Sequence, residues 1–266
     1  MKRLIHYENT FMPELRDLVE GDALFTVLYD VLSGDCNDIF TDGENIIICY
    51  SAAPYPVWVW CKDEYSLKNL MAISECVKEN FPLTEHNVIM SHGLIDKLAC
   101  IDKYYEGYKI KTNLLVYSLD KICNIQKCDG KLEIAEAKDL ETLAMMWQES
   151  AFEMEGYQLS LTQCLDDVEY MIDNEMLYAW RNYDGEIVSI ACMAELGIFN
   201  KISGVYTVPH HRRCGYAINL VRRLTELILN KNLTPVLYTN GEYIPSNDCY
   251  KKIGYYQVGR LKMITK

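Results

Sequence analysis

The sequence has no apolar stretch long enough to cross a membrane. Its longest apolar runs, such as residues 46–50 and 190–194, fall far short of the ~20 residues that a membrane helix needs. Polar residues at positions 6, 8 and 9 interrupt the segment near the amino terminus that could otherwise act as a secretory signal. We therefore expect a cytoplasmic protein with no membrane partner.

Basic residues are in deficit. The sequence has 26 Lys and Arg against 38 Asp and Glu, which gives a formal net charge of −12 at pH 7. A general nucleic-acid binder needs clustered Lys and Arg to neutralise phosphates, so this balance argues against a nucleic-acid partner. An acidic surface favours encounter with cationic substrates, although net charge affects association rather than chemistry.

Paired cysteine motifs are missing as well. The 11 cysteines are odd in number and scattered, and no two of them form a C-x-x-C pair. We interpret them as reduced thiols that serve mostly as small core residues. Cys123 and Cys128 have no histidine nearby in the sequence, so they make a poor zinc site, and we expect no metal.

The sequence does contain enough apolar side chain for a core. Of its 266 residues, 50% are hydrophobic and 24% are charged, which is typical of a folded protein. At roughly 150 residues per domain, the length fits one large domain or two small ones. Segment 120–131 is polar and has few large apolar residues. We place a domain boundary there, between a smaller N-terminal α/β domain at 1–126 and a second domain at 127–266.

The second domain has the clearer pattern. An Asp-Gly turn at 184–185 separates two stretches of strand character, and an alternating strand follows that stops at Pro209. From Gly215 the apolar residues recur at helical spacing. The predicted order is strand, two helices, three strands, helix, strand, helix and strand, an α+β arrangement. Strands are expected near 131 and at 176–181, 186–195, 201–208, 235–239 and 255–264, and helices at 137–154, 161–174, 215–228 and 246–253.

The first domain also mixes helices and strands. Its apolar runs are short and bounded by polar turns, which favours strands between amphipathic helices. Strands are expected at 46–50, 57–61, 87–91 and 113–119, and helices at 12–33, 65–79 and 95–105.

The segment from Arg212 to Ala217 lies where a predicted strand ends and a helix begins. The first N–H groups of a helix lack intrahelical partners and, with the helix dipole, attract anions such as a pyrophosphate. Gly215 lets the backbone approach a ligand, and Arg212 and Arg213 add positive charge. The alternative is an ordinary surface turn with one glycine. A nucleotide-binding regulatory site for ATP or NAD would need a Walker lysine or a G-x-G-x-x-G, and neither accompanies the turn.

Two motifs give the second domain a family resemblance. Residues 212–217, RRCGYA, match [QR]-x-x-G-x-[GA], and residues 247–255, NDCYKKIGY, match N-x-x-Y-x-x-x-G-[FY]. In this order, they resemble the motifs of the GCN5-related N-acetyltransferase (GNAT) superfamily. The resemblance covers residues 131–266.

This resemblance implies a mixed, mostly antiparallel, splayed sheet flanked by helices, with acetyl-coenzyme A as the acyl donor. It implies that backbone amides of residues 213–217 hold the pyrophosphate, and that backbone groups of Tyr206 and Val208 pair with the pantetheine arm as an added strand. Asn247 would hydrogen-bond the pantetheine, and Tyr250 would protonate the departing thiolate as general acid. The implied coenzyme-binding residues are Tyr206, Val208, Arg212, Arg213, Cys214, Gly215, Tyr216, Ala217, Asn247 and Tyr250.

The implied reaction is direct attack of an amine on the acetyl thioester in a ternary complex. The amine must be neutral to attack, so a carboxylate or a water held by one has to take its proton. The strand at 201–208 has no acid. Glu195, which ends the preceding strand, is the candidate base, with a merely solvated carboxylate as the alternative.

The acceptor is expected to be a small-molecule or peptide amine. Protein N-termini, lysines, polyamines, amino sugars and antibiotics are all compatible with the sequence. A function of another class is also compatible: a catalytically silent acetyl-coenzyme A sensor or an interaction module.

The first domain is similar in element order, from residue 46 to 119, to the C-terminal half of an acetyltransferase fold. Where the phosphate turn should lie, residues 61–66 contain no glycine, and Asp63 and Glu64 would repel a pyrophosphate. We interpret this domain as a degenerate GNAT-like domain that shapes the acceptor cleft, or alternatively as an unrelated α/β extension.

Overall fold

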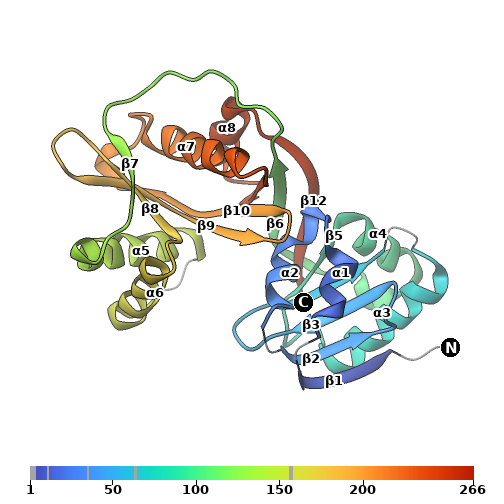
Figure 1. Ribbon diagram of the computed structural model, residues 1–266. Helices are drawn as coiled ribbons and strands as arrows, with labels where there is room; N and C mark the ends of the chain where they lie inside the picture. The colour runs from blue at the N-terminus through green and yellow to red at the C-terminus, as the bar shows by residue number, and fades with distance from the viewer. Residues whose placement is uncertain (1–3, 11, 35, 63–64, 156–157) are drawn as a thin grey trace. The chain divides into compact units, whose positions relative to one another are not determined.

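The computed structural model describes residues 4–10, 12–34, 36–62, 65–155 and 158–266. The chain divides into two compact units (Figure 1). The first unit contains the chain up to Val116 together with Thr239–Tyr243 and Gln257–Lys266, and the second contains Tyr117–Tyr238 and Ile244–Tyr256. Folding of 1–126 and 127–266 as separate domains stays a prediction.

The first unit is built on a mixed sheet with the strand order β1-β2-β3-β4-β5-β12. Neighbouring strands run antiparallel except β4 and β5, which are parallel. Its elements are β1 (Ile5–Thr10), α1 (Glu14–Val19), η1 (Ala23–Phe25), α2 (Thr26–Val31), β2 (Cys36–Thr41), β3 (Ile46–Tyr50), β4 (Val57–Cys61), α3 (Leu67–Asn80), β5 (Val88–Ser91), α4 (His92–Ile101), η2 (Lys103–Tyr105), the larger part of β6 (Lys109–Ser118) and nearly all of β12 (Tyr256–Thr265).

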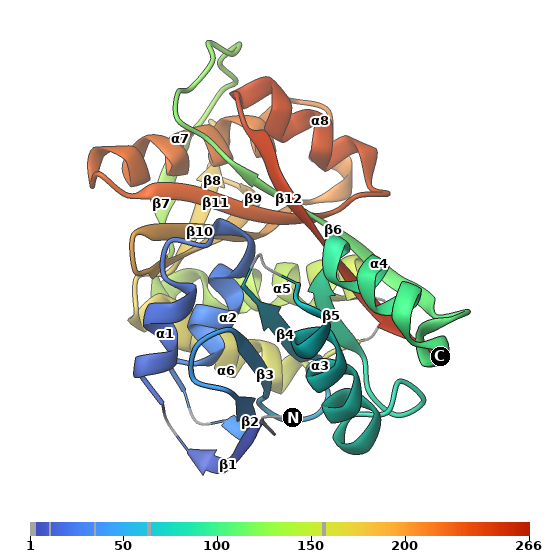
Figure 2. The same cartoon turned by 90° about the vertical axis from the view of Figure 1, so that its right-hand side faces the viewer.

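The core of the first unit lies between its sheet and α3 and α4. Every residue of β4 is buried, because this central strand is covered on both faces. Figure 2 shows α3 and α4 on one side of β4 and β5, and α1 and α2 on the other. Ser66 and Ser91 cap the two core helices by accepting hydrogen bonds from backbone N–H groups in the first turn.

Strands β3 and β4 have the predicted bounds, and α3 lies within two residues of its predicted range. The helix expected at 12–33 is wrong as one element. Gly21 has φ +81°, a left-handed conformation that ends α1, and Asp22 then accepts a hydrogen bond from the Leu24 N–H to begin η1. Strands β1 and β2 were not predicted, because polar residues such as Asn37 and Asp38 interrupt their apolar pattern.

The second unit has a mixed sheet with the order β11-β10-β9-β8-β7, and only β10 and β11 are parallel. Figure 1 shows α7 on one side of β9 and β10 and helices α5 and α6 on the other. The elements are β7 (Lys131–Ile134), η3 (Ala137–Asp139), α5 (Leu140–Glu155), α6 (Leu161–Asp173), β8 (Leu177–Arg181), β9 (Ile187–Leu196), β10 (Phe199–Thr207), η4 (Pro209–His211), α7 (Tyr216–Asn230), β11 (Thr234–Asn240) and α8 (Ile244–Ile253).

The predicted order of elements from residue 131 onward is confirmed, but its last strand, β12, lies almost wholly in the first unit. Helix α6 begins with a capping box in which Ser160 and Gln163 exchange hydrogen bonds. Helix α7 buries its apolar face, including Leu220, Val221 and Leu224, against the sheet.

Both units share one order of elements. In each, a strand and two helices precede three strands, and a helix, a strand and a helix follow, so that β4, α3, β5 and α4 correspond to β10, α7, β11 and α8. The expected α+β class, with mixed and mostly antiparallel sheets flanked by helices, is therefore confirmed in both halves.

Candidate active site

Strands β10 and β11 separate partway along their length. They pair from Phe199 opposite Thr234 to Ile202 opposite Leu237, and the pairing ends there. Both strands continue beyond this point, β10 to Thr207 and β11 to Asn240. The expected splay is thus present, and one edge of β10 is left open for about five residues.

A β-bulge lies at the start of this open stretch. The register between β10 and β9 shifts between Ser203 and Tyr206, where β10 carries one extra residue. Gly204 in the bulge has φ +59°, and a Cβ there would lie 2.6 Å from Cζ3 of Trp147 on α5. The bulge therefore requires glycine, both for its backbone conformation and for the close approach of α5.

The bulge determines which backbone groups of β10 face the open edge. The N–H of Val208 donates to the carbonyl of Val188, 3.1 Å away, and Tyr206 lies opposite Ile190 in β9. Because backbone groups alternate in direction along a strand, those of Tyr206 and Val208 point towards β9. These two residues therefore direct their backbone groups at β9 rather than at the open edge, and their role in binding a pantetheine stays a prediction. By the same alternation, we expect the backbone groups of Val205 and Thr207 to face the open edge, where the Thr207 carbonyl accepts a hydrogen bond from Arg212 Nε.

The turn after β10 presents the start of α7. Arg213 has φ +67° and Gly215 has φ +87°, and Gly215 is the N-cap of α7. The first backbone bond closed there runs from the Asn219 N–H to the Gly215 carbonyl. The N–H groups of the first turn, from Tyr216 onward, consequently have no partner inside the helix. This is the anion-attracting geometry that the sequence predicts.

The Arg212 side chain forms hydrogen bonds and an ion pair within the protein. Its Nη2 lies 2.7 and 2.8 Å from the two carboxylate oxygens of Glu153 on α5, and its Nε donates to the Thr207 carbonyl at 2.9 Å. The guanidinium also lies over the Tyr206 ring, 5.6 Å from the ring centroid. Glu153 therefore compensates the charge of Arg212, while Cys214 in the same turn is exposed.

The segment before β7 lies along the first turn of α7. Asn219 Nδ2 donates to the Gln126 carbonyl at 3.1 Å, and a Cβ on Gly215 would lie 3.7 Å from Cys128 Cβ. Burial, and then a hydrogen bond to Asp129, raise the pKa of the Tyr216 phenol to about 12. The Tyr216 side chain therefore packs in the protein, and only its backbone N–H is placed to meet an anion at the turn.

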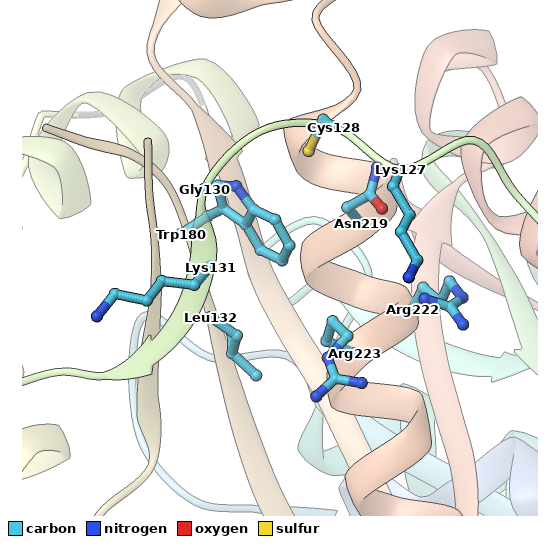
Figure 3. Close-up of a pocket in the computed structure, with 9 residues that line it drawn as sticks. All are labelled: Lys127, Cys128, Gly130, Lys131, Leu132, Trp180, Asn219, Arg222 and Arg223. Atoms are coloured by element: carbon cyan, nitrogen blue, oxygen red, sulfur yellow. The ribbon is translucent and has the colours of Figure 1, made fainter. Parts of the chain in front are cut away.

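A pocket of about 320 Å³ opens on the flank of α7 (Figure 3). Figure 3 shows Lys127, Arg222 and Arg223 along one wall. Arg222 and Arg223 both form ion pairs with Glu226. The other lining residues are Cys128, Gly130, Lys131, Leu132, Trp180 and Asn219.

Helix α8 positions the second motif. Asn247 and Tyr250 are both buried, at 3% and 6% exposure. The Tyr250 ring packs between Tyr117 and Tyr255, with centroids 6.4 and 6.2 Å away. Gly254 after the helix has φ +115°, and a Cβ there would lie 2.6 Å from the Lys121 carbonyl oxygen, which explains the glycine of this motif.

Glu195 is distant from these groups. It lies opposite Asn200 near the start of β10, whereas the open edge begins after Ile202. At 3.3 Å per residue, Glu195 is ~16 Å along the strand from Val205. Its carboxylate is 54% exposed and forms an ion pair with Lys231. The structure therefore does not bring Glu195 together with the other predicted residues.

Glu149 on α5 is an acidic residue beside β10 that no motif in the sequence indicates. The Tyr206 hydroxyl donates to Glu149 Oε2 at 2.6 Å. Burial, and then this hydrogen bond, raise the pKa of the Tyr206 phenol well above its usual value. In the sequence, Glu149 and Glu153 are four residues apart, which places both on one face of the helix predicted at 137–154. Only the fold shows that this face contacts β10 and the turn after it.

The corresponding region of the first unit is different. The predicted repulsive residues Asp63 and Glu64 lie outside the described residues. The Tyr65 hydroxyl lies 2.9 Å from Ser91 Oγ, and its ring lies beside Gly93 at the start of α4. A tyrosine side chain therefore packs where β4 and β5 end.

Across the described parts of the chain, His, Cys, Asp and Glu side chains nowhere gather in a group of three that could hold a metal ion. No helix among these residues is long and apolar enough to span a bilayer.

Part of the second unit matches a known family model. A family model described as FR47-like protein matches residues 183–262, which include β10, the turn and α8. No curated protein sequence matches the chain. Solved structures with similar folds cover nearly the whole chain at low sequence identity.

One of these is an acetyltransferase of the GNAT family from Colwellia psychrerythraea, with 12% identity and a TM-score of 0.65, covering 99% of this chain and 100% of its own. Another is a GCN5-related N-acetyltransferase from Sphaerobacter thermophilus, with 13% identity and a TM-score of 0.67, covering 99% and 95%. A Drosophila protein matches at 13% identity and a TM-score of 0.65, covering 98% of each chain. The chain therefore has the fold of the GNAT superfamily, and two GNAT-like halves make up its length.

Proposed function

We propose that the second unit binds acetyl-coenzyme A and transfers its acetyl group to an amine. The observation that carries this proposal is the early end of the β10–β11 pairing at Ile202, because the open edge of β10 leads directly to the N-terminus of α7. An extended pantetheine arm fits a free strand edge, and a pyrophosphate fits unpaired helix N–H groups. The similar solved structures support acetyl transfer at the level of the superfamily.

The residues take the following roles in this proposal. Backbone groups of Val205 and Thr207 hydrogen-bond the pantetheine, and backbone N–H groups of the turn at 213–217 bind the pyrophosphate. Asn247 on α8 binds the pantetheine near the thioester. Tyr250, four residues before the glycine of the same motif, protonates the thiolate as it leaves. The acceptor amine attacks the thioester directly.

A thiol-release assay tests this function. The intact protein is incubated with acetyl-coenzyme A and, separately, with spermidine, glucosamine and a short peptide that has a free α-amino group. We expect thiol release above the rate without amine for at least one acceptor, and an acetylated product by mass spectrometry. Binding of acetyl-coenzyme A without amine-dependent release would instead support the silent sensor, which the lack of an acid on β10 favours.

A further inference from the structure

Helix α5 contacts β10 and the turn that follows it at three successive points. Trp147 packs on Gly204 in the bulge, Glu149 accepts the hydrogen bond from Tyr206, and Glu153 binds Arg212 in the turn. The α5 residues and their partners follow the same order along the two segments. The side of α5 that carries Glu149 therefore lies directly over the part of β10 where the proposed thioester binds.

From this arrangement we infer that Glu149 is the proton acceptor for the incoming amine, an inference that rests on the proposed acetyl transfer. Tyr206 lies in the stretch of β10 beyond the end of its pairing with β11, and its side chain lies in the core cluster shared with α5 and α6. Its hydroxyl thus connects the strand that would hold the acetyl group to a carboxylate on the opposite helix. Tyr206 acts as the positioning residue for that carboxylate.

Glu149 has the properties of a proton acceptor that the neighbouring acids lack. Its Oε2 accepts the Tyr206 hydrogen bond, while its Oε1 makes no hydrogen bond within the described part of the chain, and the residue is exposed enough to meet a substrate. Glu153 uses both oxygens on Arg212. Glu195 is ~16 Å along the strand from Val205. Among these three carboxylates, only Glu149 combines a fixed position with an available oxygen.

The proton balance of the step is simple. An alkylammonium loses one proton to the Glu149 carboxylate and becomes a neutral amine, whose lone pair attacks the thioester carbonyl carbon. The carbon–sulfur bond then breaks, and its electron pair leaves with the sulfur, which takes a proton from Tyr250. The second amine proton restores the Tyr250 hydroxyl, and Glu149 releases its proton to solvent. Amide, free thiol and one proton are the products.

The test compares Glu149→Gln with Glu141→Gln in the thiol-release assay. Glu141 lies in the exposed first turn of the same helix, so the control makes the same charge change away from β10. For an alkylamine acceptor we expect Glu149→Gln to lower kcat about 10²-fold while the KM for acetyl-coenzyme A stays unchanged, as loss of a general base typically does. The deficit should shrink as the pH approaches the pKa of the amine itself, because more of the amine is then already neutral.

A second variant tests the positioning role of Tyr206. Tyr206→Phe keeps the buried ring but frees the carboxylate, and we expect a smaller loss of kcat with the same recovery at high pH. If the wild-type protein releases thiol with an amine and Glu149→Gln has the same kcat, this inference is overturned and acetyl transfer is not. If the wild-type protein releases thiol with none of the amines, acetyl transfer and this inference are both overturned.

Discussion

At the scale of single residues, Gly215 is the most demanding position in the proposed coenzyme site. Its φ of +87° is strained for any side chain, and it caps α7 where the pyrophosphate would bind. We expect Gly215→Val to abolish the rise in melting temperature that acetyl-coenzyme A produces in the native protein. Differential scanning fluorimetry with and without the coenzyme measures this.

Gly185 provides the matched control for that variant. It has nearly the same conformation, φ +86°, in the hairpin between β8 and β9, with open space around it. Gly185→Val should lower the melting temperature through similar backbone strain but keep the response to the coenzyme. An undiminished coenzyme response in Gly215→Val would place the phosphate site elsewhere.

Tyr250 is the second residue whose role can be isolated. Its ring is packed between two tyrosines, so Tyr250→Phe keeps the packing and removes only the hydroxyl. If that hydroxyl protonates the leaving thiolate, kcat should fall ~10²-fold with coenzyme affinity nearly unchanged. A coenzyme thiol is already a fair leaving group, which keeps the effect at the lower end of the usual range. Steady-state kinetics and titration calorimetry of the variant distinguish this role from a packing role, for which kcat would not change.

At the scale of elements, Asp102 joins α3 to the end of α4. Its carboxylate accepts hydrogen bonds from Ser74 at 2.5 Å and Lys78 at 2.7 Å on α3, and from the Tyr104 N–H of η2. The hydrogen bonds from Lys78 and then Ser74 lower the pKa of Asp102 to about 2. A carboxyl whose pKa is lower in the folded than in the unfolded chain stabilises the fold when it is ionised.

The stability that Asp102 contributes is therefore complete above its unfolded pKa of about 3.8 and is lost as the pH falls towards about 2. We expect Asp102→Asn to lower the free energy of unfolding at pH 7 by ~1 kcal/mol and to weaken its dependence on pH between these two values. Urea unfolding at a series of pH values measures both effects. Asp184→Asn, in the exposed hairpin turn, should change neither the free energy of unfolding at pH 7 nor its dependence on pH. An equal effect of Asp184→Asn would contradict the assignment of this stability to the Asp102 hydrogen bonds.

The same scale shows how far the sequence could predict the fold. Long elements with one strong period, such as α7, and continuous apolar strands, such as β3 and β4, were predicted because local sequence alone determines them. The short strands β1 and β2 were not, since their polar residues are tolerated by pairing in the sheet. The bulge at Gly204 was also not predicted, and it shifts by one residue which backbone groups face the open edge of β10.

The candidate site was predictable only in its local parts. The turn at 212–217 and the α8 motif are contiguous in the sequence, and the structure places each on the expected element. Glu149 could not be found in this way, because its link to Tyr206 joins residues far apart in the chain. Glu195 is the acid that ends the strand before β10, and the antiparallel register of β9 with β10 places it opposite Asn200, away from the open edge.

At the scale of the whole molecule, two halves with one element order differ in the turn that leads into the helix after their three central strands. In the second half, the turn between β10 and α7 contains Gly215. The corresponding residues of the first half, 61–66, contain no glycine. Both halves keep a sheet and a core, but only the second has the turn to which we assign the proposed phosphate site. We therefore expect a single coenzyme site per chain.

The most direct test of the central claim is the binding of acetyl-coenzyme A to the intact protein, measured by titration calorimetry beside ATP and NAD. The account predicts saturable binding of acetyl-coenzyme A with one site per chain, and a rise in melting temperature from this ligand that ATP and NAD do not produce. Two sites per chain would contradict the assignment to the second unit. An equal response to ATP, or no binding of acetyl-coenzyme A, would contradict the coenzyme site itself.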